Sequence, residues 1–473
     1  MADDGPETEI LILGGGISGL GAALSAASSG AACLLLEKEE RVGGLWGSEY
    51  RDGFIFDHGV HGLYAAGPGM EDAVAELKRV AGEIFVEADK NTRILFRGRL
   101  VRYPLQPGEF FTTYGAQGLL WALSLVAARL RITLTGDRWM RSFRDYAVGN
   151  FGSLLYRIYF ERYLKKVWGV DPSRLDLESV ARRVKRIRIR TFLGQQLRRA
   201  LGMPGRQTYD GLQPLRIVYP RHGAQRVVDA MRRSAEEHGA RIVTGAEATG
   251  IRLDGGRYAV TVAQGGGSRG FSARSIVSTL PLPDLLGLLA PRPDAALAET
   301  IRSLRYRALR LLNVMLDCGT VFEAQWTYFQ GDEFSFSRIN EYRNLSPEFC
   351  PPGKTGISVE FNCDAGDRLW SMPDDELFAL TVRELGQPVG GRRDIGELVR
   401  ARQRGYFSVR FAHAYPLMEV GTPAHLERAR AFIARFPRLR SIGRQGQFRY
   451  MNGDECFRAA ADAVAALRNE ENR

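Results

Sequence analysis

Paired cysteines, metal-binding histidine motifs and targeting signals are all missing from this sequence. Its five cysteines are scattered without C-x-x-C spacing, which indicates neither a disulfide framework nor a zinc site. Its six histidines form no H-E-x-x-H or similar cluster, so we expect no metal. The N-terminus opens with acidic residues, unlike the basic and then apolar pattern of a secretory signal. We therefore expect a cytoplasmic protein.

Long apolar runs are missing too. No stretch reaches eighteen continuous apolar residues, about the length that a membrane-spanning helix needs. The strongest run, Leu119–Leu130, contains Ser124 and Arg129 and is too short to cross a bilayer. We expect this run to form a buried helix, with docking on a membrane surface as the alternative. No transmembrane segment is therefore predicted, and peripheral membrane contact stays open.

Negative charge is in the minority. The 473 residues carry a net charge of +11, and much of the excess lies in residues 182–199. Such a basic stretch attracts nucleic acid, anionic lipid or an anionic small molecule, or it forms an ordinary solvated helix face. Because the sequence contains no nucleic-acid-binding motif, we expect no nucleic-acid partner and favour a small anionic substrate.

A glycine-rich loop follows a short apolar run near the N-terminus. Residues 9–13 are predicted to form a buried strand, residues 18–28 a helix and residues 31–36 a second strand. The loop between the first strand and the helix has G-x-G-x-x-G spacing, with which βαβ units bind the pyrophosphate of a dinucleotide. The alternative is a structural turn without a ligand. The residues around the loop decide between dinucleotide binding and such a turn.

Each glycine of this loop has its own task. Gly14 permits the tight turn, Gly16 lets the backbone approach a pyrophosphate, and Gly19 lets helix and strand pack closely. The start of the helix offers free N–H groups and the positive end of its dipole. Glu37, at the end of the second strand, can accept hydrogen bonds from ribose hydroxyls. Together these features favour dinucleotide binding.

The residues after Glu37 indicate which dinucleotide is bound. Arg41-Val42-Gly43-Gly44 follows after three intervening residues. The stretch from Glu37 to Gly44 resembles the extended fingerprint of FAD enzymes of the amine oxidase and protoporphyrinogen oxidase superfamily. In that resemblance the paired glycines bring the backbone close to the flavin side of the cofactor. An NAD dehydrogenase would not need them, so the resemblance implies FAD.

The length of the chain allows two or three packed domains, and the pattern of segments predicts an α/β protein (α+β overall). We expect a discontinuous Rossmann-like FAD-binding domain made of residues 1–64, 212–290 and 438–473. A mainly helical insertion is expected over residues 65–211, and a substrate domain with a mixed sheet over residues 291–437.

Several separated motifs follow one another across nearly the whole chain: "DHGVHGLY", "RILFRGRLVRYPL", "FGSLLYRIYFERYLKKVWG", "VARRVKR", "FSFSRINEYRNLSPE", "AYPL" and "GRQGQFRY". In sequence and order they resemble the motifs of the UDP-galactopyranose mutases and their FAD-dependent relatives of glycan biosynthesis. The resemblance implies that His61 lies beside the flavin. It also implies two substrate-binding arginines, Arg182 (with Arg183 as the alternative) and Arg338.

The same resemblance assigns the aromatic residues. It implies that Tyr163 and Trp168 contact the nucleotide base, and that Tyr415 and Tyr450 line the substrate cleft. The predicted substrate-binding set is Tyr163, Trp168, Arg182, Arg338, Tyr415 and Tyr450, and the predicted catalytic set is His61, Arg182, Arg338, Tyr415 and Tyr450. The predicted cofactor-binding set is Gly14, Gly16, Ile17, Ser18, Gly19, Glu37, Lys38, Gly43, Gly44, Leu45, His61, Ala248, Gly443, Arg444 and Asn452.

Physical chemistry agrees with part of this assignment. Guanidinium groups give bidentate contacts to phosphate, and an aromatic ring can stack on a base. Plainer roles exist for each residue: Tyr163 and Trp168 could be core aromatics of a helix, and His61 an ordinary histidine beside a turn. Arg338 lies in an apolar, strand-like stretch and would be costly to bury alone. Its plainer role is a structural ion pair with Glu341 or another acid.

Three departures from the mutase pattern leave the reaction open. A second histidine and a threonine of the mutase motif are missing around His61, Phe448 stands where a tyrosine is expected, and His58 has no counterpart. Three hypotheses follow. The first is a mutase-like enzyme that rearranges the sugar ring of a nucleotide-diphosphate sugar through reduced flavin. The second is an FAD-dependent oxidoreductase that takes hydride from an anionic, sugar-like or amine substrate. The third is a non-catalytic flavoprotein.

Overall fold

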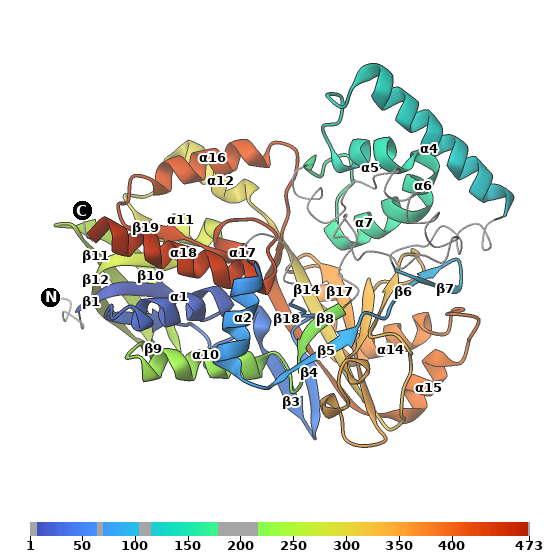
Figure 1. Cartoon of the computed structure of the whole chain (residues 1–473), viewed down its shortest axis with the longest axis horizontal. Helices are drawn as coiled ribbons and strands as arrows, with labels where there is room; N and C mark the ends of the chain where they lie inside the picture. Colours follow the sequence, from blue (N-terminus) through green and yellow to red (C-terminus); the bar gives the residue numbers. More distant parts are fainter. Residues whose placement is uncertain (1–6, 64–69, 104–114, 178–215, 472–473) are drawn as a thin grey trace.

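The computed structural model describes residues 7–63, 70–103, 115–177 and 216–471 (Figure 1). Two large sheets lie side by side, and a cluster of helices lies beyond the second sheet. The first and last described residues lie at the side of the first sheet that is turned away from the second sheet. The predicted fold class, a Rossmann-like sheet with a helical insertion and a mixed substrate sheet, is confirmed.

The first sheet has the strand order β13-β10-β11-β12-β1-β2-β9, with β19 paired to β12. Its strands are β1 (Glu7–Leu13), β2 (Cys33–Leu36), β9 (Arg241–Val243), β10 (Ala246–Asp254), β11 (Arg257–Gln264), β12 (Gly267–Ser278), β13 (Leu289–Ala290) and β19 (Leu439–Ser441). Strand β1 pairs in parallel with β2 and β12, and β12 pairs in parallel with β19. Segments from three distant parts of the chain therefore form this part of the sheet.

Alternation along β1 explains why helices cover both faces of this sheet. Ile10 and Ile12 point into one core, and Leu11 and Leu13 into another. The first core is closed by α1 (Ile17–Ser28), α2 (Met70–Ala81), α10 (Gln225–Glu237) and α18 (Gly453–Glu471). The second is closed by α11 (Leu282–Leu288), α12 (Ala295–Ser303) and α16 (Thr422–Ile433). Strands buried on both faces read as continuous apolar runs, as the sequence does here.

The second sheet has the strand order β18-β14-β17-β16-β15-β6-β7. Its strands are β6 (Thr92–Phe96), β7 (Arg99–Arg102), β14 (Tyr306–Leu316), β15 (Trp326–Phe329), β16 (Arg338–Glu341), β17 (Thr355–Cys363) and β18 (Gln403–Pro416). The hairpin of β6 and β7 comes from the predicted helical insertion and joins the sheet through a parallel pair with β15. The outer face packs against α13 (Arg368–Ser371), α14 (Asp374–Glu384) and α15 (Ile395–Arg402). We call the opposite face the inner face.

Two small antiparallel sheets of two strands each complete the fold. One pairs β3 (Ser48–Arg51) with β4 (Phe54–Asp57), and the other pairs β5 (Phe85–Asp89) with β8 (Arg216–Pro220). Short helical turns are η1 (Gly44–Trp46), η3 (Tyr342–Asn344), η4 (Pro347–Phe349) and α17 (Gly443–Gly446). The helical cluster consists of α4 (Ala116–Thr135), α5 (Phe143–Phe151), α6 (Ser153–Leu155), the π-helical turn η2 (Tyr156–Phe160) and α7 (Glu161–Trp168).

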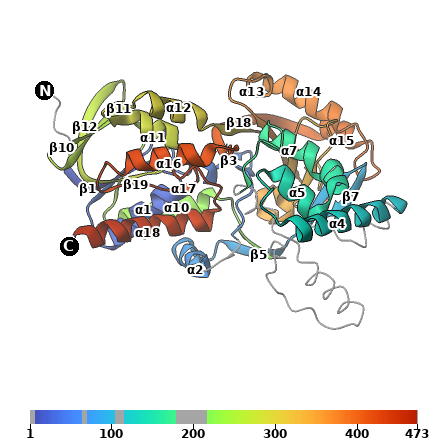
Figure 2. The same cartoon turned by 90° about the horizontal axis from the view of Figure 1, so that it is seen from above.

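The expectation that residues 119–130 form a buried helix is wrong. They belong to α4, a helix of 20 residues at the outer edge of the molecule (Figures 1 and 2). Leu120, Leu123, Leu130 and Leu134 are exposed, and the helix packs against α5 and α6 through other side chains. Within the described part of the chain, α4 alone is long and apolar enough to cross a membrane by length and composition.

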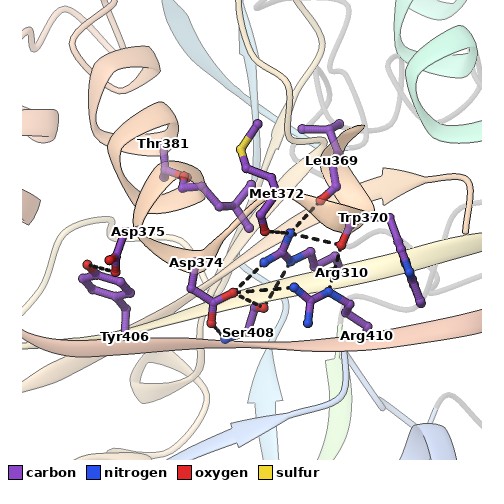
Figure 3. A network of polar contacts seen from close by, with 11 residues as sticks. Arg310, Leu369, Trp370, Met372, Asp374, Asp375, Thr381, Tyr406, Ser408 and Arg410 are labelled. Atoms are coloured by element: carbon purple, nitrogen blue, oxygen red, sulfur yellow. Dashed lines mark hydrogen bonds and ion pairs between the residues drawn. The ribbon is translucent and has the colours of Figure 1, made fainter. Parts of the chain in front are cut away.

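A fully buried arginine ties the outer face of the second sheet to α13 and α14 (Figure 3). Arg310 of β14 donates to the carbonyl oxygens of residues 369, 370 and 372 at 2.7, 3.3 and 2.6 Å. It also donates to Asp374 Oδ1 at 2.5 Å and to Ser408 Oγ at 3.1 Å. Each nitrogen of this guanidinium group thereby has a hydrogen-bond partner, as burial of a charge requires.

Candidate functional site

The glycines of the first loop fit the tasks expected of them. Gly14 has φ +99°, and a Cβ atom there would lie 2.3 Å from Thr279 Oγ1. A Cβ atom on Gly19 would lie 1.8 Å from the Gly14 carbonyl oxygen, so helix and strand can approach only without a side chain. Around Gly16 the space is open: the nearest atom to an added Cβ is the Gly43 carbonyl oxygen at 4.0 Å.

The start of α1 has the features of an anion site. The helix begins at Ile17 with Gly16 as its N-cap, no side chain caps it, and its first turn contains no acid. Its first N–H groups therefore lack the side-chain partners that a helix start needs. Ser18 is buried in this first turn. A cradle of open glycine backbone beside an uncapped helix start fits the pyrophosphate of FAD.

Glu37 lies at the end of β2 and organises the loop. Its Oε2 accepts from Gly15 N at 2.5 Å, and its Oε1 accepts from Glu39 N at 3.0 Å. Each oxygen keeps a lone pair that can accept from a ribose hydroxyl. The Glu37 carbonyl accepts from Ala246 N, which brings the half-buried Ala248 of β10 to the same end of the site. Lys38 lies on the surface, 3.8 Å from Glu39.

The second glycine pair lies against the first loop. Gly43 N donates to the Gly15 carbonyl at 2.9 Å. Gly44 has φ +53°, and a Cβ atom on it would lie 3.7 Å from Gly16 Cα. The half-buried Leu45 follows in η1. The paired glycines thus extend the open cradle around Gly16 as the fingerprint predicts.

The C-terminal motif closes the cradle from the other side. Gly443 has φ +79°, and an added Cβ would lie 2.6 Å from Ser18 Oγ. Arg444 donates from Nε and Nη2 to the Met451 carbonyl at 2.9 and 2.7 Å. Asn452 precedes α18, where its N–H donates to Glu455 Oε2 at 2.8 Å. The start of α18 therefore lies next to the start of α1.

His61 lies beside Trp46 of η1, which in turn contacts the start of α18. Its ring is 5.1 Å from that of Trp46, and a Cβ atom on Gly453 would lie 2.0 Å from the Trp46 ring. The Nε2 atom is buried without a hydrogen-bond partner, an arrangement that a bound ligand would complete. Burial, followed by the charge of Arg444, lowers the pKa of His61 to about 3. The ring is therefore neutral at physiological pH.

This pKa predicts a pH-dependent stability. Between pH 6.5 and about 3 the unfolded chain binds a proton on His61 that the folded protein does not, so stability falls as the pH falls. We expect His61→Gln to remove this dependence, which amounts to about 1.4 kcal/mol per pH unit within the window. Urea unfolding at several pH values measures it. His238→Gln, at the exposed end of α10, is the control, and an unchanged slope in His61→Gln would contradict the assignment.

A buried carboxylate and tyrosine hold the segment that carries His61. Asp57 accepts from Ser48 Oγ at 2.5 Å, from Tyr219 Oη at 2.7 Å and from Ala224 N at 2.9 Å. Burial raises the pKa of Asp57. Tyr342 Oη donates to the carbonyls of residues 57 and 59, which joins this segment to the inner face of the second sheet. The hydrogen-bond network around Asp57 was not predicted from the sequence. Its only sequence signal was an acidic residue directly before His58.

Arg338 lies on the inner face and is paired. Its Nη2 donates to Glu360 Oε1 at 2.7 Å, and its Nη1 lies 3.5 Å from Tyr328 Oη. Glu360 is 2% exposed, and the same oxygen accepts from Asn340 Nδ2 at 2.6 Å. Of the partners considered from the sequence, Glu341 or another acid, the structure shows another acid, Glu360. Glu341 instead accepts from residues 320, 321, 322 and 355 on the other side of the strand.

Neutral polar groups surround this pair. Register places Asn313 opposite Ser358, and Ser358 opposite Asn340, on adjacent strands of the inner face. Both amide atoms of Asn313, Asn340 Oδ1 and Arg338 Nε are buried without hydrogen-bond partners. Buried polar atoms nearly always have hydrogen-bond partners, so we expect this row of side chains to face a bound ligand. The sequence did not reveal it, because the residues come from three separate strands.

Aromatic rings line the side of the site nearer the helical cluster. Tyr415 lies 6.3 Å from Trp168 and 6.4 Å from Tyr450, with the two tyrosine rings nearly parallel. The Arg444 guanidinium lies 4.7 Å from the Tyr450 ring centre. Tyr163 contacts Tyr328 at 5.9 Å, and Trp168 is 4% exposed in the core of the cluster. Of the residues predicted to bind substrate, Arg182 lies outside the described residues.

Lys90 is a further charged group beside the site that sequence reasoning missed. Its Nζ lies 5.5 Å from the Tyr103 ring and 5.8 Å from the Trp326 ring. Burial, and then the charge of Arg338, lowers its pKa to about 8. The side chain therefore titrates near physiological pH.

Comparisons with known proteins agree with this geometry. The family model described as "Flavin containing amine oxidoreductase" matches residues 17–441. A 4,4'-diaponeurosporene oxygenase of Staphylococcus haemolyticus is 24% identical over 285 residues, which cover 53% of this chain and 53% of that protein. The chain thus spans about half the length of that curated relative.

Solved structures share the fold over nearly the whole chain. Reduced UDP-galactopyranose mutase has a TM-score of 0.78 at 19% identity and covers 98% of this chain and 96% of its own. Cyclohexylamine oxidase from Brevibacterium oxydans has a TM-score of 0.68 at 17% identity and covers 99% and 100%. At these identities the likeness concerns the fold. The family match over most of the chain, with a cradle shaped for a flavin dinucleotide, makes this protein a member of the flavin-containing amine oxidoreductase family, with FAD as its cofactor.

Proposed function

We propose that the protein oxidises an organic substrate by removing hydride from a C–H bond, with the substrate bound at the inner face beside Arg338. The observation that carries this proposal is the 2.7 Å ion pair between Arg338 and Glu360. A guanidinium fork binds a diphosphate through free N–H groups and uncompensated charge. Here an internal carboxylate already compensates that charge. The site therefore suits a sugar-like or amine substrate better than a nucleotide diphosphate.

The side chains of the site have separate tasks in this proposal. Asn313 and Asn340 offer a neutral donor and two acceptors, which suit a hydroxyl or amine group of the substrate. Tyr415 and Tyr450 form an apolar wall that excludes water. His61 stays neutral and positions the cofactor through Nε2. Bound FAD supplies the acceptor for the hydride.

The names of similar proteins support oxidation. The relative from Staphylococcus haemolyticus is named as an oxygenase, and the neighbour from Brevibacterium oxydans as an oxidase. Fold likeness alone does not fix a reaction. The support therefore rests on the family together with the compensated charge at Arg338.

A mutase-like rearrangement of a nucleotide-diphosphate sugar is the second candidate. The observation that favours it is the convergence of Tyr415, Tyr450 and Arg444 in one site, as the resemblance to the mutases implies. The mutases rearrange the sugar at constant mass and need reduced flavin. The two candidates therefore differ in the flavin state that they require.

One anaerobic experiment separates them. The holoenzyme is incubated with a panel of amines, sugar alcohols and nucleotide sugars, first with oxidised flavin and then after dithionite reduction. Oxidation predicts bleaching of the oxidised flavin and a product lighter by two hydrogens, read by mass spectrometry. A product of unchanged mass that forms only with reduced flavin would overturn the proposal in favour of the mutase reaction.

The ion pair gives a kinetic prediction for whichever substrate the panel identifies. We expect Arg338→Met to lower kcat/KM by the equivalent of about 2–4 kcal/mol, because it leaves the buried Glu360 carboxylate uncompensated beside the substrate. Arg343→Met, a change on η3 where the arginine donates to the Lys354 carbonyl, is the control. Steady-state kinetics measure both. Unchanged kinetics in Arg338→Met would remove this residue from the site.

A further inference from the structure

Helix α4 presents an apolar outer face. Among the described residues, eight large hydrophobic side chains are exposed, and five of them lie on this helix. These are Leu120, Leu123, Val126, Leu130 and Leu134, each 58–75% exposed. Their spacing of three, three, four and four residues aligns them on one side of a helix about 30 Å long. Such a continuous apolar stripe is unusual on a surface that faces only water.

The opposite side of α4 is fixed to the protein. Trp121 Nε1 donates to the Phe151 carbonyl at 3.1 Å, and Arg129 Nη1 lies 3.4 Å from Asn150 Oδ1. Ser124 meets Ser153 at 3.4 Å. Because polar groups on this side hold the helix against α5 and α6, α4 lies along the molecular surface and is not placed to cross a bilayer.

Positive charge borders the apolar face at both ends. Arg97, in the turn of the β6–β7 hairpin, donates to Gln117 Oε1 at 2.8 Å, so this turn adjoins the start of α4. Arg131 and the exposed Arg138 and Arg141 lie at its other end. Residues 116–135 contain no acid, and residues 115–141 contain four arginines and one aspartate. This pattern complements a surface that is apolar inside and anionic outside.

We propose that α4 docks the protein on the surface of an anionic phospholipid bilayer. The helix lies in the plane of the interface, with its leucine stripe about 5–10 Å into the boundary between headgroups and acyl chains. The flanking arginines contact lipid phosphates. This proposal concerns a surface at the outer edge of the molecule and stands independently of the reaction at the inner face (Figure 2).

Vesicle cosedimentation of the holoenzyme tests the proposal. We expect binding to vesicles of phosphatidylcholine mixed with phosphatidylglycerol, and weaker binding to phosphatidylcholine alone or at high salt. The double change Leu123→Gln and Leu130→Gln should lower the partition coefficient at least about tenfold, because it interrupts the stripe. Val420→Gln, which changes a side chain 53% exposed on another part of the surface, should leave binding unchanged.

The outcomes separate the possible occupants of this face. Circular dichroism reports that the helices of each variant remain folded, and flavin absorbance reports that its cofactor cradle, which lies apart from α4, is intact. Equal binding of the double variant and the parent protein would overturn the proposal. Absence of vesicle binding, together with a dimer in sedimentation velocity that the double change dissociates, would also overturn it and assign the stripe to a second copy of the chain.

Discussion

Gly16→Val should give a protein that folds but is colourless after purification. Gly16 has φ −74°, which any residue adopts, and an added Cβ would have no protein atom closer than 4.0 Å. The space that valine fills is the approach to the pyrophosphate at the start of α1. We expect the affinity for FAD to fall at least about 100-fold, equivalent to about 2.7 kcal/mol. Flavin fluorescence titration of the apoprotein measures this loss.

Two other glycines make the result interpretable. Gly319→Val places the same side chain in open space away from the cradle and should leave FAD affinity unchanged. Gly19→Val puts a Cβ atom 1.8 Å from the Gly14 carbonyl oxygen, so it should damage folding itself. If Gly16→Val were purified with its yellow colour, the assignment of this loop to the cofactor would be wrong.

Arg310→Met should lower the free energy of unfolding by about 3–5 kcal/mol. Methionine fills much of the space, but the change removes the nearer of the two guanidinium groups beside Asp374 and the donor to three carbonyl oxygens. Arg310 is fully buried and Asp374 partly so, and the loss of a buried partner together with its hydrogen bonds has effects of this size. Urea unfolding of the holoenzyme, followed by circular dichroism, gives the difference.

Arg410 provides the matched control in the same network. Its side chain is 38% exposed, lies 3.8 Å from Asp374 and donates to the Trp370 carbonyl at 2.9 Å. Because solvent screens such a pair, we expect Arg410→Met to lower the free energy of unfolding by less than about 1 kcal/mol. Equal stabilities of the Arg310 and Arg410 variants would contradict the role given to burial.

The cofactor cradle could be predicted from the sequence because its signals are local. The spacing of Gly14, Gly16 and Gly19 between two apolar runs determines a strand, a turn and a helix within about 30 residues. Glu37 and the following glycines extend the same unit. Such patterns depend on backbone conformation and near neighbours, which a sequence displays directly.

The substrate side depends on strand register, which a sequence does not display. Arg338 and Glu341 lie three residues apart on a strand and therefore point to opposite faces, a fact that the alternation of strands already implied. The partner of Arg338 is Glu360 of β17, which lies directly opposite Arg338 in the strand register. Asn313 reaches the same face from a third strand. Long-range pairing of this kind follows from the fold and not from any motif.

The outward orientation of α4 was missed for a related reason. Composition shows that residues 119–130 are apolar, but only the neighbours of a helix determine which of its sides is covered. Trp121 and Arg129 anchor one side, and the leucines at 123 and 130 are left on the other. A buried helix and an interfacial helix share this composition and differ in their partners.

The cradle for FAD is complete only when residues 443–453 lie against the N-terminal loop. Gly443 rests against Ser18, and Gly453 rests against Trp46, so residues more than 400 positions apart form one wall. These partners are synthesised far apart in time, and contacts of such high sequence separation form late. The nascent chain therefore carries an open nucleotide site until residues 443–453 have been synthesised. Flavin binding then joins segments that lie far apart in the sequence.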